Sequence, residues 1–321
     1  MKLTKTQSNS LYVAKAFAIL SVVCAHMTFT NEYTIAEIVR NCLGQIGVCI
    51  FFITSGFFYK RIDNDSKEFW VKKLKNAFIP WLVISGCTFL LSTVLSRSLS
   101  GFPLSYIKYF LGLGSLYWYM TISFILFAVF KYITKNWQLI LCVFISVISV
   151  YLTAFEVIPH NEYFNQYINL FNWIGFFALG ILIRKENWLE KLINAKMFVF
   201  SVIGLVISIL FAVLRDNEIK SYVDVTSLFI EIFGFMVVLN LSKLLAKNKL
   251  LIDVGKKSFF IYLMHIQIAG LINTRLPYNV VFFVLRPFIA LAICYVISIV
   301  FKYILKILRL SKFNCVFGLD R

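Results

Sequence analysis

Long apolar runs follow one another along almost the whole chain, and short Lys-rich polar segments separate them. A helix needs about 20 predominantly apolar residues to cross the hydrocarbon core of a bilayer. No polar stretch between the runs is long enough to form a separate domain. The pattern therefore predicts an all-α, polytopic membrane protein that forms one domain over residues 1–321 and has about ten transmembrane helices, at residues 10–30, 43–60, 77–96, 116–134, 138–155, 167–183, 197–214, 225–245, 257–275 and 280–305.

The composition agrees with a membrane protein and argues against a soluble one. Of the 321 residues, 60% are hydrophobic and 15% are charged, whereas soluble domains are nearer half apolar and one quarter charged. The net charge of +17 comes from basic residues that flank the apolar runs, so it does not indicate a nucleic-acid partner. The seven cysteines show no CxxC spacing, and we expect them to be packing residues rather than metal ligands or disulfides.

The distribution of Lys and Arg predicts the orientation in the membrane. If the N-terminus is cytoplasmic, the inner segments hold 24 of the 32 Lys and Arg residues and the outer segments hold six, while acidic residues divide evenly. Lys and Arg are retained on the cytoplasmic side of membrane proteins. We therefore expect an even number of helices and two cytoplasmic termini.

The first apolar run contains two ionisable side chains, Lys15 and His26. Their separation of eleven residues is close to three helical turns, which places both on one face, about 16 Å apart along the axis. Ionisable residues inside a membrane helix usually line a path for a ligand or take part in chemistry. This face is the first candidate functional site.

Other polar residues within the apolar runs extend the candidate site. Glu231 should be paired, either structurally with Arg286 or, as a sharper hypothesis, with His26, whose imidazole it would orient. Ser258, Tyr262 and His265 recur at spacings of four and three, so they share one helix face.

Two further features have both a plain and a functional interpretation. The cytoplasmic lysines Lys72, Lys73 and Lys75 are expected either to anchor the topology or to bind an anionic ligand. Trp118, with its tyrosine neighbours Tyr117 and Tyr119, is expected to lie in the outer aromatic belt of the membrane.

Five segments, taken together and in order, resemble motifs of the acyltransferase-3 family of bacterial membrane O-acyltransferases. A basic residue followed after ten positions by His matches Lys15 and His26, although the family usually has Arg at the first place. The other matching motifs are FFxxSGF at Phe51–Phe57 with Ser55, a basic run before proline at Lys72–Pro80, LWF at Leu116–Tyr119 with Trp118, and SxxIYLxH at Ser258–His265.

Two departures narrow the resemblance to one part of the family. A large subgroup has a Glu where this chain has Ser123, and we expect no esterase-like domain after the membrane helices. A further difference lies in the basic run, where Asn76 stands in place of a second Arg that is often found there. The chain thus looks closer to the short subgroup that includes fucose 4-O-acetylases and the enterobacterial common antigen O-acetyltransferase.

The resemblance implies an enzyme of the bacterial inner membrane that moves an acyl group from cytoplasmic acyl-CoA to a hydroxyl of a cell-surface or lipid-linked glycan. The donor would be acetyl-CoA, with succinyl-CoA or another short acyl-CoA as an alternative, and no cofactor would be bound. The expected partners are acyl-CoA, the glycan and membrane lipid, but no nucleic acid. In this scheme His26 and Glu231 are catalytic, Lys15, Lys72, Lys73 and Lys75 bind the donor, and the other candidates are Ser55, Trp118, Ser258, Tyr262, His265 and Arg286.

Two questions stay open at the level of sequence. His26 can act as a general base in a direct transfer or carry the acyl group as an acyl-histidine. A transporter or flippase of a glycan intermediate is the alternative function, because a path lined by ionisable residues would serve it too. Broken helices or an internal repeat would favour transport, and the sequence shows neither convincingly.

Overall fold

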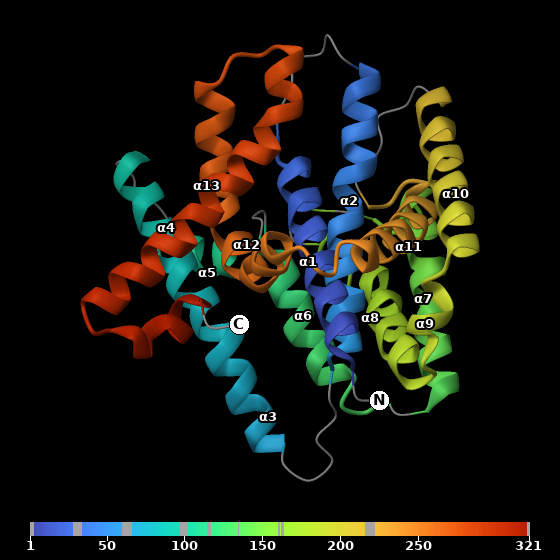
Figure 1. The fold of residues 1–321 in the computed structure, drawn as a ribbon, viewed down its shortest axis with the longest axis horizontal. Coiled ribbons are helices and arrows are strands. Elements are labelled where there is room, and N and C mark those ends of the chain that lie inside the picture. The colour runs from blue at the N-terminus through green and yellow to red at the C-terminus, as the bar shows by residue number, and fades with distance from the viewer. Residues whose placement is uncertain are drawn as a thin grey trace.

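Helix α1 (Lys5–Ala25) stands in the middle of the computed structural model, and the other helices surround it (Figure 1). The structure describes residues 3–27, 34–59, 66–96, 102–113, 117–133, 135–159, 161, 164–215 and 222–319. Thr4 begins α1 with a capping box: its side chain accepts from the Gln7 N–H at 3.2 Å, and the Gln7 side chain accepts from the Thr4 N–H at 2.9 Å. These two bonds satisfy backbone donors that a helix start leaves open.

Helix α1 packs most extensively against α2 (Thr34–Phe57) and α12 (Lys249–Arg275). Small residues allow this close approach, as is usual between membrane helices. A Cβ atom at Gly47 of α2 would collide with the Ala18 carbonyl oxygen of α1. Gly47 is therefore a packing residue between these two helices.

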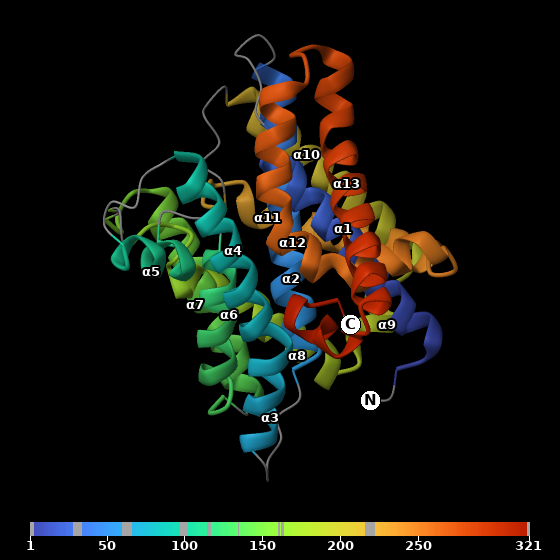
Figure 2. The same cartoon turned by 90° about the vertical axis from the view of Figure 1, so that its left-hand side faces the viewer.

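The remaining long helices form two flanks around this centre. On one side, α2 packs against α8 (Leu170–Lys185), which in turn packs against α7 (Asn136–Ala154). Next to them, α11 (Ser227–Leu244) contacts α1, α2 and α10 (Ala195–Leu214). On the other side, α13 (Val280–Ile307) runs beside α12 as a hairpin partner, which Figure 2 shows clearly.

A continuous helical segment carries the basic residues that precede Pro80. It consists of α3 (Ser66–Lys73), one π-helical turn (Leu74–Phe78) and α4 (Ile79–Ser96). Proline has no N–H to donate to the carbonyl four residues earlier, and its ring crowds that carbonyl. The wider π turn lies where the helix must accommodate this proline, and such turns are frequent at functional sites.

Short helices complete the chain: α5 (Leu104–Leu111), α6 (Trp118–Val129), α9 (Trp188–Leu192) and a 3₁₀ helix over Ser311–Phe317. The described residues contain no β-strand. The start of α1 and the C-terminal 3₁₀ helix both lie in the lower half of Figures 1 and 2.

The all-helical membrane architecture is confirmed, but the number of spans is lower when length and apolarity are both required. Seven helical segments in the described chain meet both requirements: Lys5–Ala25, Ile35–Phe57, Lys67–Val94, Asn136–Ala154, Ala195–Leu214, Ser227–Leu244 and Val280–Ile307. The predicted spans at 116–134 and 167–183 correspond to α6 with 12 residues and α8 with 16 residues, which are short for a bilayer. Helix α12 is long enough, but its first turns carry Asp and Lys side chains, so it does not meet the requirement for apolarity.

Candidate active site

A cavity of about 530 Å³ lies where α1, α2, α3, α6 and α12 meet. This volume falls within the usual range of small-molecule sites. Gly255 of α12 permits the arrangement, because a Cβ atom there would collide with the Tyr12 carbonyl oxygen of α1. The cavity therefore depends on a close contact between the two helices that carry the predicted histidines.

Four lysines line this cavity: Lys15 from α1, Lys72 and Lys73 from α3, and Lys256 from α12. No acidic side chain is among its lining residues in the described structure. The site thus has a formal charge of +4 and is suited to a ligand with several phosphate groups. Lys72 and Lys256 are exposed, so the basic side of the cavity is accessible.

Aromatic rings lie against the lysine side chains. Lys73 Nζ is 3.7 Å from the centroid of the Phe127 ring, and Lys15 Nζ is 4.9 Å from that of Phe58. Such contacts hold an ammonium group in place at the wall of the cavity.

Besides the lysines, several side chains with hydroxyl groups line the cavity. Ser55 Oγ and Tyr119 OH are 3.3 Å apart, and Ser258 and Ser123 also line the cavity. Ser123 Oγ is buried and has no hydrogen-bond partner in the part of the chain that the structure describes. A buried hydroxyl without a partner is unfavourable, so this position suits a polar group of a ligand.

A row of four rings leads from the cavity to the two membrane histidines. The Tyr119 and Tyr262 ring centroids are 5.4 Å apart, those of Tyr262 and His265 are 5.6 Å apart, and those of His265 and His26 are 5.1 Å apart. Tyr119 belongs to the cavity wall, whereas His26 does not. The predicted common face of Ser258, Tyr262 and His265 is therefore confirmed, and it connects the cavity to His26.

The hydrogen bond of His265 fixes the roles of its two ring nitrogens. Its Nδ1 lies 2.5 Å from the Tyr262 carbonyl oxygen, to which it can only donate. Nε2 then carries the lone pair. Because Nε2 is buried and has no hydrogen-bond partner among the described residues, His265 supplies an unused acceptor beside the His26 imidazole.

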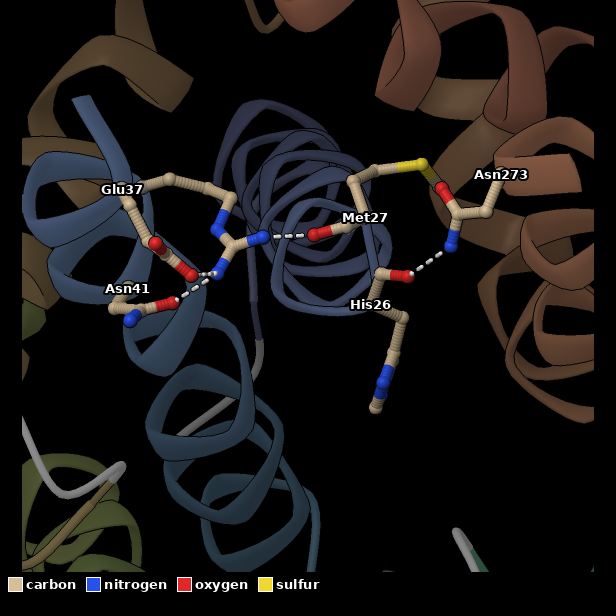
Figure 3. A network of polar contacts seen from close by, with 6 residues as sticks. His26, Met27, Glu37, Asn41 and Asn273 are labelled. Atoms are coloured by element: carbon tan, nitrogen blue, oxygen red, sulfur yellow. Dashed lines mark hydrogen bonds and ion pairs between the residues drawn. The ribbon is translucent and has the colours of Figure 1, made fainter. Parts of the chain in front are cut away.

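Backbone contacts hold His26 at the end of α1 (Figure 3). Asn273 Nδ2 of α12 donates to the His26 carbonyl at 3.0 Å, and Arg40 of α2 donates to the next carbonyl, that of Met27. Arg40 also binds the side chains of Glu37 at 3.2 Å and Asn41 at 2.7 Å. Figure 3 shows the imidazole pointing away from this network, so the network positions the backbone and leaves the ring available.

His26 lies well inside the N-terminal end of α2, although α1 ends one residue before it. Ala25 is the residue that faces Gly44, and α2 begins at Thr34, ten residues before that level. Ten helical residues correspond to about 15 Å. His26 is thus at membrane depth, and Lys15 lies about 16 Å from it along α1.

Comparison with known families decides the relationship that this geometry suggests. The acyltransferase domain family matches residues 8–306. The chain belongs to the acyltransferase-3 family. No curated protein and no solved structure matches the chain significantly.

As an acyltransferase-3 protein, the chain brings most of the predicted donor-binding lysines together. Lys15, Lys72 and Lys73 line one cavity, whereas Lys75 is exposed and does not line it. Lys256, one of the inner basic residues of the sequence, also lines the cavity and was not predicted to do so. Its neighbour Lys257 points elsewhere and pairs with Asp253, and only the three-dimensional placement distinguishes these two lysines.

Both predicted pairings of Glu231 are wrong. Glu231 is fully buried, but neither of its carboxylate oxygens has a hydrogen-bond partner within the described chain. Arg286 instead donates to the carbonyls of Leu276 at 2.7 Å and Pro277 at 3.0 Å, so it holds the turn between α12 and α13. The neighbour of His26 is a second histidine rather than a carboxylate.

The aromatic-belt interpretation of Trp118 is also wrong. Its side chain is buried, and its ring centroid lies 5.0 Å from that of Trp173 and 5.5 Å from that of Tyr167. Tyr117 is buried too, and its hydroxyl donates to the Leu263 carbonyl of α12 at 3.1 Å. These residues fix the start of α6, and the next residue, Tyr119, reaches the cavity.

Proposed function

We propose that this acyltransferase-3 protein is an O-acyltransferase that uses cytoplasmic acyl-CoA, with acetyl-CoA as the first donor to test, to acylate a hydroxyl of a cell-surface or lipid-linked glycan. One observation carries the proposal: the acid-free lysine cavity is joined to the His26–His265 pair by a continuous row of rings. The cavity suits the donor nucleotide, and the histidine pair suits the chemistry.

The donor nucleotide would occupy the basic side of the cavity. CoA carries a diphosphate and a 3′-phosphate, and the ammonium groups of Lys15, Lys72, Lys73 and Lys256 match this charge. The rings of Phe58 and Phe127 offer flat apolar surfaces for the adenine. The pantetheine arm would then follow the hydroxyl-lined wall toward Tyr119.

Tyr119 and Tyr262 lie between the cavity and the histidines, so the acyl end of the arm must pass these rings. The Tyr119 hydroxyl lies 3.3 Å from that of Ser55, and a thioester in the cavity could replace this polar contact. We infer that the two rings move when the donor binds. In the absence of donor they keep water from the histidine pair.

At His26, an imidazole nitrogen accepts the proton of the acceptor hydroxyl while its oxygen attacks the thioester carbonyl carbon. The tetrahedral intermediate then collapses, the carbon–sulfur bond breaks, and the departing thiolate of CoA takes the proton from the imidazolium. Attack by His26 itself, followed by transfer from an acyl-histidine to the hydroxyl, balances equally. In both routes His26 touches the reacting atoms.

His265 is a positioning residue in this scheme. Its Nε2 acceptor lies on a ring next to His26 and is held in that state by the bond from Nδ1 to a backbone carbonyl. A hydrogen bond from the His26 ring to this acceptor would fix the tautomer and orientation of His26. This arrangement replaces the carboxylate that usually orients a catalytic histidine.

The function implies a particular topology. We infer that α6, α8 and α12 cross the membrane together with the seven longer spans, which gives ten helices and two cytoplasmic termini in a bacterial inner membrane. The lysine bias toward one side supports this orientation, and three of these inner lysines, Lys72, Lys73 and Lys256, line the donor cavity. Within the family we place the chain in the short subgroup that resembles fucose 4-O-acetylases and the enterobacterial common antigen O-acetyltransferase.

Proteoliposomes with labelled acetyl-CoA on one side and a candidate glycan on the other provide the test. Labelled glycan that forms only when both are present would support vectorial O-acylation. Glycan that crosses the membrane unmodified, with no free CoA formed, would contradict the proposal and indicate a transporter or flippase. Succinyl-CoA in place of acetyl-CoA tests the choice of donor.

A further inference from the structure

Two buried side chains outside the lysine cavity carry polar groups that no described residue binds. Glu231 of α11 is fully buried, and Gln45 of α2 is 1% exposed. Neither oxygen of the Glu231 carboxyl group has a hydrogen-bond partner within the described chain, and the same is true of Gln45 Nε2. A carboxyl group that is buried without partners is unfavourable. Inside a membrane bundle such a group indicates a functional site.

Contacts between α2 and α11 bring these two residues to the same part of the bundle. Cys49 Sγ lies 3.6 Å from the Glu231 carbonyl oxygen, and Cys49 is one helical turn away from Gln45 on α2. A Cβ atom at Gly234 of α11 would lie 2.5 Å from the side chain of Ile46, which directly follows Gln45. Both contacts join the turn of α11 that holds Glu231 to the turns of α2 next to Gln45.

Tyr222 contacts both residues and adds an aromatic ring, and we call Glu231, Gln45 and Tyr222 the Glu231 cluster. The Tyr222 backbone N–H donates to Gln45 Oε1 at 3.2 Å, which leaves Nε2 as the donor end of this amide. The Tyr222 side chain interacts electrostatically with Glu231. Its ring centroid lies 5.3 Å from that of Trp173 and 6.1 Å from that of Trp118. A carboxyl group, an amide donor and aromatic rings suit a sugar, whose hydroxyl groups form hydrogen bonds and whose C–H face packs on a ring.

The Glu231 cluster lies next to the histidine pair. Tyr222 also interacts electrostatically with Tyr262, and the Tyr262 ring centroid is 5.6 Å from that of His265. Tyr262 therefore adjoins both the row of rings from the donor cavity and the Glu231 cluster. A ligand that the cluster binds would bring a further hydroxyl group close to His265 and His26.

The backbone of Tyr222 has a conformation that favours an opening movement. Its φ is 69°, in the left-handed region that bulky residues rarely adopt. Such a conformation is unfavourable and persists only where the surroundings impose it, as the bond to Gln45 does here. Because Glu231 and Gln45 are enclosed, Tyr222 must move before a ligand can reach them. Loss of its bond to Gln45 would let its backbone relax, which favours this movement.

We propose that Glu231 and Gln45 bind adjacent hydroxyl groups of the acceptor, a neutral sugar unit whose ring packs on Tyr222. The carboxyl group can pair with sugar hydroxyls whether or not it is ionised, because each hydroxyl both donates and accepts. A sugar acid fits less well, since its carboxylate would lie beside that of Glu231 and like charges repel each other in a buried site. This role takes the place of the predicted pairing of Glu231 with His26. The inference rests on the proposed acylation of a glycan and names the class of acceptor.

Sugar binding without any acyl-CoA tests this site separately from acyl transfer. Purified protein in lipid is titrated with the methyl glycosides of glucose, galactose, fucose, N-acetylglucosamine and glucuronic acid, and tryptophan fluorescence reports binding because Trp173 lies beside Tyr222. We expect saturable binding of at least one neutral glycoside. Glu231→Gln should weaken this binding by about tenfold or more, and Gln45→Met by about fivefold, since hydrogen bonds to a charged group are the stronger ones. Glu156→Gln is the matched control, because it removes a carboxylate from an exposed position.

The results separate a sugar site from a structural role of Glu231. Weaker glycoside binding in Glu231→Gln and Gln45→Met, but not in Glu156→Gln, supports the site, provided that Glu231→Gln unfolds at the temperature of the wild type or above it. Equal binding by all variants, or no binding of any glycoside by the wild type, overturns it. Binding of the glucuronic acid glycoside as tightly as the neutral ones overturns the assignment to a neutral sugar. Binding that depends on Glu231 in a wild type that releases no CoA would count against the proposed acylation and not against this site.

Discussion

The imidazole rings of His26 and His265 lie with their centroids 5.1 Å apart, although His26 directly follows α1 and His265 lies within α12. Asn273 donates to the backbone carbonyl of His26, and the His265 ring donates from Nδ1 to the Tyr262 carbonyl. The contact therefore results from tertiary packing of α1 and α12, and it gives His26 a neighbour that sequence alone did not provide.

The first prediction concerns this neighbour. In His265→Phe the ring shape remains but the Nε2 acceptor is lost, so His26 loses its orienting partner. We expect kcat to fall by about 10- to 100-fold, since a positioned base contributes at least this much, while the KM for acyl-CoA stays the same. The pH profile of kcat should also change, because the proton affinity of His26 depends on its neighbour.

Its control is His265→Gln, which keeps a polar acceptor on the same helix face and should lose less activity than the Phe variant. A Phe variant with the kcat and pH profile of the wild type would show that His265 has only a packing role.

The second prediction tests the lysine cavity as the donor site. Lys72→Gln and Lys73→Gln should each raise the KM for acyl-CoA by about tenfold, because a charge-assisted contact to phosphate is lost. Lys75→Gln is the internal control. It removes the same charge from the same segment, but Lys75 does not line the cavity, so steady-state kinetics should show a change of less than about twofold.

Equal effects of all three substitutions would instead indicate that these lysines attract acyl-CoA through the overall positive charge of the surface, without direct contact. An additional measurement separates the two cases. The KM of the wild type should rise with ionic strength, and the KM of the Lys72/Lys73 double variant should depend on salt much less.

The third prediction concerns the rings between cavity and histidines. Tyr262→Ala removes the ring that contacts both Tyr119 and His265, so water should reach the thioester. We expect the ratio of CoA release without an acceptor to acyl transfer with an acceptor to rise by about 3- to 10-fold. Tyr262→Phe keeps the ring and should behave like the wild type, whereas an unchanged ratio in Tyr262→Ala would exclude a barrier role for this residue.

Part of this site follows directly from the sequence. The spacing of Ser258, Tyr262 and His265 is realised on α12, whereas the predicted common face of Lys15 and His26 is interrupted, because α1 ends at Ala25 and His26 is its C-cap. The relation on α12 is local, and helical periodicity determines it. The long apolar runs likewise give the helical architecture, because a membrane leaves few alternatives to helices.

The parts that could not be predicted depend on packing between distant segments. The His26–His265 contact and the position of Lys256 require knowledge of how α1 and α12 meet, which the close approach at Gly255 decides. The expected partner of Glu231 was wrong because charge complementarity alone does not say which helix faces which. Trp118 was assigned to the membrane surface from its place in the chain, but the short helix α6 carries it into the core.

The fourth prediction tests the close contact that shapes the donor site. Gly255→Ala places a methyl group against the Tyr12 carbonyl, so α12 must shift away from α1. We expect a loss of about 1–3 kcal/mol in stability, visible as a lower unfolding temperature, together with a higher KM for acyl-CoA.

The matched control lies on the same helix. A Cβ atom at Gly270 would have no neighbour within 4 Å, so Gly270→Ala should leave stability unchanged or slightly raised. If both alanine variants have the same unfolding temperature and the same KM for acyl-CoA, the close approach of α12 to α1 at Gly255 contributes neither to stability nor to the donor site.

The most direct measurement compares the wild type with His26→Ala in the release of free CoA from acetyl-CoA by purified protein in lipid. Our account predicts slow release by the wild type, faster release with a glycan acceptor, and a loss of about 10²-fold or more in the variant. Binding of acetyl-CoA should be retained, because Lys15, Lys72, Lys73 and Lys256 are untouched. Release by His26→Ala at the rate of the wild type would contradict the central role of His26.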